Sequence, residues 1–322
     1  MDALSDVLRA AHLNGGVFLQ AEFTAPWCIM VRATTALCAP FLGPAAHLIP
    51  YHYVVEGELH VAVEGAESEP LASGDVVLFP QNHGHLLASD PSLPPVFGRD
   101  VILPPEGSGL YSIRHGGGGA STRMICGYLG CDAAYGNPVV ATLPASMKIK
   151  VADAGPAEWI RSTFQYAANE VASGRPGSQT VLAKISELLF VEAVRRYVQD
   201  LPADRTGWLA GLRDPVVARA LALMHGDIAR PWNVEDLGRE AAISRSALAE
   251  RFTRIIGMAP MHYLTHWRMQ VAAQKLKNTN ASLAQVADLV GYESEAAFSR
   301  AFKKTFGTAP ATWRRSENSH PD

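Results

Sequence analysis

Several features that mark particular classes of protein are missing from this chain of 322 residues. No apolar run approaches the ~20 residues of a transmembrane helix, so no contact with a membrane is expected. The N-terminal stretch MDALSDVL carries Asp2 and Asp6 and lacks the basic and apolar regions of a secretory signal. Four cysteines do not make a disulfide scaffold at this length. In a reducing cytoplasm, where we expect the protein, such cysteines stay free, bind metal or react with oxidants.

Charge is also scarce, since charged residues make up 18% of the chain and hydrophobic residues 48%. This balance excludes global disorder and provides for a sizeable core, and the length suggests about two domains. The net charge of −3 gives no sign of a nucleic-acid partner. It conceals an asymmetry, however. Residues 1–213 carry 14 basic against 20 acidic residues, whereas residues 214–322 carry 14 against 11. A basic C-terminal part directs the search for a nucleic-acid site to that end.

The sequence pattern of the first 150 residues is typical of β-structure. Short apolar runs are separated by turn signals such as Val-Glu-Gly at 55–57 and Ser-Gly-Asp at 73–75. Short strands at regular spacing predict a sandwich or a small barrel. The expected strands are Trp27–Arg32, Tyr51–Val55, Leu59–Val63, Val76–Phe79 and Met124–Leu129, with a flexible loop at Gly116–Gly119.

Helical patterns replace the strands after residue 150. Two long amphipathic segments without glycine, Glu158–Ser173 and Ser178–Val198, predict helices. Gln199–Arg213 contains Pro202, Asp204 and Gly207 and is interpreted as a linker. Everything after Asp214 is predicted helical, with breaks at Pro231, Gly257–Pro260, Asn278–Asn280 and Gly307–Pro310. The expected domains are therefore 1–150, 151–213 and 214–322.

An internal repeat stands out in the last hundred residues. The segment Ser244-Arg-Ser-Ala-Leu-Ala-Glu-Arg-Phe, followed by Gly257 and Pro260, recurs fifty residues later as Ser294-Glu-Ala-Ala-Phe-Ser-Arg-Ala-Phe with Gly307 and Pro310. Each copy predicts a short helix, a tight turn, a serine N-cap and a second helix. That arrangement is a helix-turn-helix motif.

The second helix of each copy carries polar side chains where DNA would be met. Leu248, Phe252, Phe298 and Phe302 are expected to face the core, and the segment Pro260–Lys277 to hold the two motifs apart as one helix. Two recognition helices ~34 Å apart would enter successive major grooves. A helical repeat with solvated charges explains one copy but not two basic copies at a fixed offset. The predicted DNA-binding residues are Arg245, Ser246, Glu250, Arg254, Glu295, Ser299, Arg300, Lys303 and Lys304.

These residues resemble the DNA-binding domain of AraC/XylS-type transcription regulators. The resemblance covers residues ~214–315 and is carried by Trp232-Asn-Val-Glu-Asp-Leu, Arg268-Met-Gln-Val-Ala-Ala and above all Gly291-Tyr-Glu-Ser-Glu-Ala-Ala-Phe-Ser-Arg-Ala-Phe-Lys. Gly238 departs from the alanine usual in the family, and glycine in a helix costs roughly 1 kcal/mol against alanine. The resemblance implies a regulator that binds operator DNA, activates or represses transcription and is not an enzyme.

The N-terminal half is similar to the cupin-like sensing domains of that family. Gly74-Asp-Val-Val-Leu-Phe-Pro-Gln-Asn-His-Gly-His85 follows the second cupin motif, whereas the first motif is degraded to His47 and His52 without a carboxylate. The implied fold is α+β: a cupin-like β-barrel, a helical dimerisation and linker region, and an all-α domain with two helix-turn-helix motifs. In the family the helices of 151–213 commonly carry dimer contacts; alternatively, they only pack on the barrel.

Three interpretations of the barrel interior remain open. In the first, alternation along Tyr51–Val55 puts His52 and Val54 on one face, and the cupin resemblance implies that this face is turned inward, beside His85. Cys126 and Cys131 then complete a tetrahedral set suited to zinc. In the second, Cys126 is a small core residue and His85 a hydrogen-bonded barrel histidine. The third is redox sensing by Cys28, Cys126 or Cys131, because the half also looks like the branch that includes reactive-chlorine-responsive activators.

The function expected from the sequence is therefore DNA-binding transcriptional regulation, with a metal, an oxidant or a small molecule as the signal. The expected partners are double-stranded operator DNA, RNA polymerase and a second copy of the chain. The competing hypotheses are a cupin-type metalloenzyme and a small-ligand-binding module with a helical appendage. The enzyme needs a metal with open coordination positions, and the degraded first motif counts against it. The binding module leaves the doubled motif unexplained.

Overall fold

The computed structural model describes residues 3–10, 13–34, 47–104, 111–131, 138–149, 177–202 and 204–318, together with Cys38 and the single positions 162, 163 and 166. The chain divides into two compact units. The barrel unit consists of His12–Ala134 and Leu143–Tyr197, and the helical unit of Met1–Ala11, Tyr135–Thr142 and Val198–Asp322. No helix within the described ranges combines the length and apolar character needed to cross a membrane.

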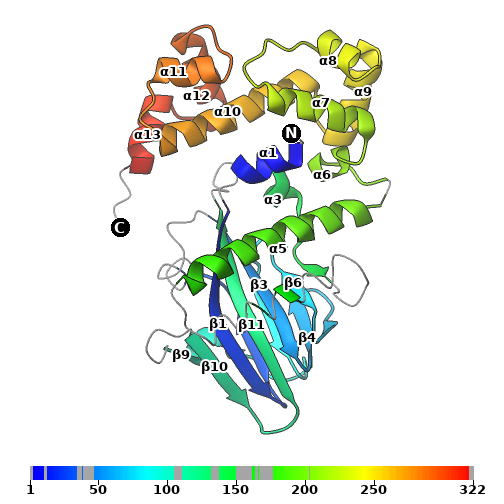
Figure 1. The fold of residues 1–322 in the computed structure, drawn as a ribbon, viewed down its shortest axis with the longest axis vertical. Coiled ribbons are helices and arrows are strands. Elements are labelled where there is room, and N and C mark those ends of the chain that lie inside the picture. The colour runs from blue at the N-terminus through cyan, green and yellow to red at the C-terminus, as the bar shows by residue number, and fades with distance from the viewer. Residues whose placement is uncertain are drawn as a thin grey trace. The chain divides into compact units, whose positions relative to one another are not determined.

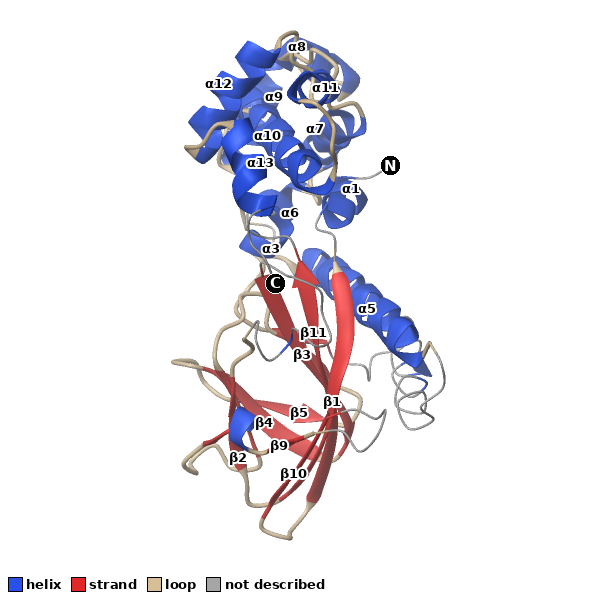
Figure 2. Ribbon diagram, turned by 90° about the vertical axis from the view of Figure 1, so that its left-hand side faces the viewer, coloured by secondary structure: helices blue, strands red, loops and turns tan. Residues whose placement is uncertain are grey.

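Two sheets build the barrel unit (Figures 1 and 2). The seven-stranded sheet has the order β12-β6-β3-β11-β1-β10-β9 and the five-stranded sheet the order β5-β4-β7-β2-β8. The strands of the first sheet are β1 (Asn14–Thr24), β3 (His47–Glu56), β6 (Val76–Leu78), β9 (Ile102–Leu103), β10 (Tyr111–Gly116), β11 (Ser121–Cys131) and β12 (Met147–Ile149). Those of the second are β2 (Cys28–Val31), β4 (Glu58–Val63), β5 (Glu69–Ala72), β7 (His85–Ala88) and β8 (Val96–Phe97), followed by the short 3₁₀ helix η1 (Gly98–Asp100).

The five predicted strands are all present, displaced at their ends by a few residues. β2, β3, β4, β6 and β11 occupy the predicted runs, and the loop 117–120 joins β10 to β11. Alternate side chains of β11 enter the core between the sheets, namely Met124, Cys126 and Tyr128, as the period-2 geometry of a strand requires. The predicted barrel-like sheet structure is therefore confirmed.

Helix α5 (Ser178–Asp200) covers the outer face of the seven-stranded sheet. It confirms the predicted helix over Ser178–Val198, whereas the predicted helix Glu158–Ser173 lies almost wholly outside the described residues. Glycine lets α5 approach the sheet closely, because a Cβ on Gly15 would lie 2.5 Å from the carbonyl oxygen of Ala183. The Tyr51 hydroxyl of β3 meets the Ser186 hydroxyl of α5 at 2.6 Å in the buried interface.

The helical unit contains two segments from the N-terminal part of the chain. α1 (Ala3–Ala10) packs against α7 (Pro215–Gly226), and α3 (Pro138–Thr142) packs against α6 (Trp208–Gly211). The observed units thus differ from the expected division at residues 150 and 213. The predicted linker is only partly a linker, because Trp208 is buried and its indole N–H donates to the Tyr263 hydroxyl at 2.6 Å.

The remaining helices carry the repeat. They are α8 (Val234–Glu240), α9 (Arg245–Ile256), α10 (Pro260–Asn278), α11 (Leu283–Leu289), α12 (Glu295–Phe306) and α13 (Pro310–Asn318). α10 runs between the α7–α9 group and the α11–α13 group (Figure 1). All four predicted helix breaks coincide with boundaries between successive helices from α7 to α13, with Pro260, Asn278 and Pro310 as terminal helix residues. The expected α+β architecture, with a sheet-rich N-terminal part and a helical C-terminal part, is confirmed.

Candidate functional site

The two helix-turn-helix motifs are built by the same local interactions. Ser244 caps α9 by accepting a hydrogen bond from the Ala247 N–H at 3.3 Å, and Ser294 caps α12 in the same way from Ala297 at 3.2 Å. Both helices end at a glycine in the left-handed region, with φ of 85° at Gly257 and 74° at Gly307. Serine caps and left-handed glycines are the termination signals that the sequence contained.

The four residues predicted to face the core do so. Leu248, Phe252, Phe298 and Phe302 are all fully buried. The turn that joins the two helices of each motif is one residue longer in the second motif than in the first. Ala242 takes a left-handed conformation with φ of 55°, and its counterpart one residue out of register is Gly291 with φ of 76°. A Cβ on Gly238 would lie 2.8 Å from the Ile243 carbonyl oxygen, so this departure from the family pattern accommodates the tight turn.

Eight of the nine predicted DNA-binding side chains are exposed. Ser299 is half-buried, and the other eight lie at the surface of α9 or α12: Arg245, Ser246, Glu250, Arg254, Glu295, Arg300, Lys303 and Lys304. Sequence reasoning missed Thr253, which is exposed on the same side of α9 as Glu250. The spacing from the buried Leu248 and Phe252 places it there, because residues three apart share a helix face.

Not every basic residue near these helices is available to a partner. Arg251 belongs to α9, but its guanidinium binds the Asp214 carboxylate at 2.7 Å. That carboxylate also caps α7 by accepting from the N–H groups of Val216 and Val217, which helps to hold the pKa of Asp214 below its usual value. Arg251 therefore fastens α9 to the start of α7.

α10 holds the two motifs in one unit. Its Arg268 donates to the carbonyl oxygens of Ile228 at 2.9 Å and Arg230 at 2.7 Å. Gly291 of the second motif lies directly against the Ala229 carbonyl and the Arg268 guanidinium, where a Cβ would collide. The loop at 228–230, α10 and the second turn thus form one contact. The predicted rigid connection over Pro260–Lys277 corresponds to α10.

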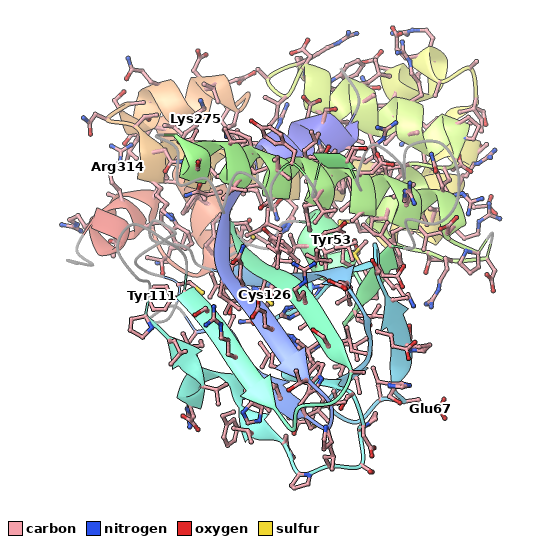
Figure 3. All side chains as sticks on the ribbon, turned by 60° about the horizontal axis from the view of Figure 1, so that its bottom comes forward. Tyr53, Glu67, Tyr111, Cys126, Lys275 and Arg314 are labelled. Carbon is pink, nitrogen blue, oxygen red and sulfur yellow. The ribbon has the colours of Figure 1, made fainter. Side chains whose placement is uncertain are left out.

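The barrel interior brings together three of the predicted metal ligands. His52 lies on β3, His85 on β7 and Cys126 on β11, directly across from His52 in the sheet register. The His52 Nδ1 is 2.9 Å from the Cys126 Sγ, and the His52 Nε2 is 2.8 Å from the His85 Nε2. All three side chains are buried, and Cys126 lies among the strands of the barrel in Figure 3.

The hydrogen-bond directions in this cluster follow from the partner of the His85 ring. The His85 Nδ1 is 3.1 Å from the backbone carbonyl of His83, which can only accept, so Nδ1 carries the proton. In a neutral His85 the Nε2 then accepts from the His52 Nε2–H. The His52 Nδ1 is left as an acceptor for the Cys126 thiol. Every polar atom of this Cys126–His52–His85 chain is thus used in the neutral state.

The pKa values agree with a neutral cluster. Burial lowers the pKa of His52 well below its ordinary value, and the neighbouring His85 lowers it further. Burial also lowers the pKa of His85 to about 4 and raises the pKa of the Cys126 thiol. Removing a charged group from water is costly, so burial favours the uncharged form of all three side chains.

The predicted four-ligand zinc site does not fit this geometry. His52 directs one ring nitrogen to Cys126 and the other to His85, so the three groups form a line and do not converge on one point. Cys131 lies five residues after Cys126 on β11, which turns it to the opposite face about 16 Å along the strand. Within the described residues, no three His, Cys, Asp or Glu side chains are arranged to hold a metal ion.

The redox alternative lacks the thiol chemistry that it requires. Cys28, Cys126 and Cys131 are free but buried, whereas a sensor thiol is accessible and has a low pKa. Burial raises the pKa of Cys28, and Asp90 raises it further. Cys126 and Cys131 are too far apart for a disulfide without breaking β11. Sequence reasoning missed Cys38, which packs in the same core cluster as Cys126; burial raises its pKa to about 12.

A small cavity of about 40 Å³ adjoins the cluster. His52, Cys126 and Tyr128 line one part of it, and Arg32 and Arg99 are among the lining residues too. The rest of its wall is apolar: Leu19, Ala21, Phe23, Ile29, Met30, Val31, Leu87, Ile102, Ile113 and Met124, with Gly98. The barrel therefore contains a mainly apolar space that also has hydrogen-bonding side chains in its wall.

Comparisons with known proteins match both halves of the chain. A cupin family model matches residues 2–199, and a helix-turn-helix domain model matches residues 237–316. A putative AraC-like transcription regulator of Streptomyces lividans is 36% identical over 98% of both chains. The HTH-type transcriptional regulator AlkR of Acinetobacter baylyi is 30% identical over 98% of this chain and 99% of its own. The RCS-specific HTH-type transcriptional activator RclR of Escherichia coli is 25% identical over 98% of this chain and 97% of its own. With these two regions in this order, the chain belongs to the family of AraC-type helix-turn-helix transcription regulators that carry an N-terminal cupin domain.

Proposed function

We propose that this protein binds operator DNA through α9 and α12 and that a small molecule held in the barrel unit controls this binding. The observation that carries the sensing part is the cavity beside Cys126, His52 and His85, where buried polar groups meet an apolar wall. The DNA-binding part is supported by two identically capped helices with exposed polar faces. The regulator would act in the cytoplasm and contact RNA polymerase. The active form would be a homodimer, and the exposed Leu188 of α5 is a candidate residue for the contact between the two copies.

The chemistry of the cavity favours a small apolar effector with one hydrogen-bonding group. Apolar side chains form most of its wall, and the His52–Cys126 pair is part of that wall. A space of about 40 Å³ holds one small group, so a larger effector must displace lining side chains. Because His52 and Tyr51 are successive residues on β3, a displacement of His52 is passed to the Tyr51–Ser186 contact with α5. The effector then binds one conformation of the barrel more tightly than the other and shifts the equilibrium toward that conformation.

The test of DNA binding uses Arg300→Ala and Lys304→Ala in the full chain. Each change removes an exposed positive charge from α12, so we expect both variants to bind an operator duplex more weakly. Where the lost side chain contacts a phosphate, the slope of log affinity against log salt concentration should also fall by about one. Fluorescence anisotropy at several salt concentrations measures both. Arg114→Ala is the matched control, because Arg114 is exposed on the barrel unit and pairs with Glu22. Unchanged DNA affinity in both α12 variants would remove α12 from the DNA interface.

The test of sensing uses Ala21→Val, which places two more carbon atoms in the cavity. Ala21 lines the cavity from β1 and is buried, so the larger side chain occupies the proposed effector space. In the unaltered protein we expect one member of a panel of small apolar alcohols, ketones and acids to raise the melting temperature and change operator affinity. Ala21→Val should lose both responses and keep the operator affinity of the effector-free protein. A response that survives in Ala21→Val places the effector elsewhere.

A further inference from the structure

The two recognition helices can be compared residue by residue with an offset of 50. Their serine caps, buried positions, left-handed glycines and following prolines coincide at this offset. Leu248 and Phe252 therefore correspond to Phe298 and Phe302. A side chain at a given position of α9 consequently has the same orientation in its motif as the side chain fifty residues later. Chemical differences between such pairs are differences in what each helix presents to DNA.

The face opposite the core differs sharply between the helices. At 100° per residue, the position two residues after the first core side chain lies on the outer face; it is Glu250 in α9 and Arg300 in α12. Both side chains are exposed. The position three residues later is Thr253 in α9 and Lys303 in α12, again exposed. α12 thus presents two positive charges where α9 presents a carboxylate and a hydroxyl.

Glu250 is free to act on an external group. No ion pair joins it to another side chain in the described part of the chain, whereas the neighbouring Arg251 is committed to Asp214. A carboxylate on a helix that lies against DNA is repelled by phosphate, so its favourable partners are the amino groups on base edges. Cytosine presents its N4 amino group in the major groove without a neighbouring acceptor on the same base. Adenine places its N7 acceptor beside its amino group, where it repels a carboxylate.

We propose that Glu250 and Arg300 select opposite bases at corresponding positions of the two operator subsites. Glu250 accepts a hydrogen bond from the N4 amino group of a cytosine, and Arg300 donates two hydrogen bonds to the O6 and N7 atoms of a guanine. This inference rests on the proposed binding of DNA through α9 and α12. It adds a base identity to each helix: one strand of the operator carries cytosine in the α9 subsite where it carries guanine in the α12 subsite.

The experiment is selection of binding sites from randomised duplexes with the full chain, followed by affinity measurements on the selected sequence. The unaltered protein should select cytosine at one position and guanine at the corresponding position of the other subsite. Glu250→Gln should change the first preference to adenine and Glu250→Arg should change it to guanine, because these side chains pair bidentately with those bases. Each wrong base should cost roughly tenfold or more in affinity. Arg300→Ala should lose only the guanine preference.

Glu235→Gln is the matched control. Glu235 is exposed on α8 of the same unit, so its replacement removes an equal charge away from the recognition helix. It should raise affinity similarly for all sequences and leave the selected bases unchanged. The inference is overturned if both Glu250 variants select the same sequence as the unaltered protein. If the unaltered protein selects no preferred sequence at all, the proposed operator binding itself is overturned.

Discussion

Gly127→Ala is expected to destabilise the barrel unit by at least about 3 kcal/mol. Gly127 of β11 lies directly across from Tyr51 of β3, and the Tyr51 ring covers it. A Cβ at this position would collide with the Tyr51 phenol and lie 2.5 Å from the Gly16 carbonyl oxygen. Moving Tyr51 away breaks its buried 2.6 Å hydrogen bond with Ser186, which ties α5 to the sheet.

Urea denaturation of the full chain measures the loss, with hydrogen exchange of peptides from β3 and β11 to identify the unit that unfolds. Gly226→Ala is the control, because Gly226 ends α7 and a Cβ there meets nothing within 4 Å. It should change stability by less than about 0.5 kcal/mol. Removing Tyr51 as well should cost less than the sum of the two single changes, since the collision disappears with the ring. A loss of under about 1 kcal/mol for Gly127→Ala would contradict the proposed packing of Tyr51.

Acid is expected to destabilise the barrel unit, by about 2 kcal/mol between pH 7.5 and pH 5 from His85 alone, with His52 adding to the loss. In the unfolded chain His52 and His85 take up protons below a pKa near 6.5. In the folded barrel burial lowers both pKa values, that of His85 to about 4, so the folded state binds fewer protons across this window. The stabilisation is therefore fully present above pH 6.5 and decreases as the pH falls, by about 1.4 kcal/mol per unit for each histidine.

The measurement is urea denaturation at pH 7.5, 6 and 5. At each point a short hydrogen-exchange pulse, always at the same labelling pH, reports how much of the barrel peptides is unfolded. Replacing both histidines in a His52→Leu/His85→Leu variant should remove most of the pH dependence of these peptides. His83→Ala is the matched control: the side chain is exposed, and the backbone carbonyl that binds His85 stays in place. His225 lies in the helical unit with its pKa lowered by burial to about 3, so peptides of α7 should also lose protection in acid. A barrel stability that is the same at pH 7.5 and pH 5 would show that the cluster takes up protons when folded.

The recognition helices were predictable because their determinants are local. Serine caps, left-handed glycines and the 3.6-residue spacing of Leu248 and Phe252 act within a few residues of each other along the chain. The offset between the two motifs then identified equivalent positions without any knowledge of packing. His52 and His85 were also correctly expected inside the barrel, because alternation put His52 and Val54 on one face and the cupin resemblance implied that this face and His85 point inward.

The differences between expectation and structure concern one strand face, the boundary between the units and one uncharged helix residue. Cys131 was grouped with Cys126 by proximity in the chain, yet an odd separation on β11 turns it to the other face. The division expected at residues 150 and 213 differs from the two compact units because α1 and α3 pack in the helical unit, to which no local pattern assigns them. Thr253 was missed because it is neither charged nor part of the family motif.

The sequence by itself therefore determined the family, five of the strands, the two helix-turn-helix motifs and the residues that they expose. These follow from periodicity, capping and a repeat, all of which operate over short stretches of chain. Only the tertiary structure decided that His52 links Cys126 to His85 in a line, that Gly127 accommodates Tyr51, and that α5 is tied to β3 by Ser186. Such features depend on sheet register and on helix-to-sheet distance, which are set by the packing of the whole barrel core.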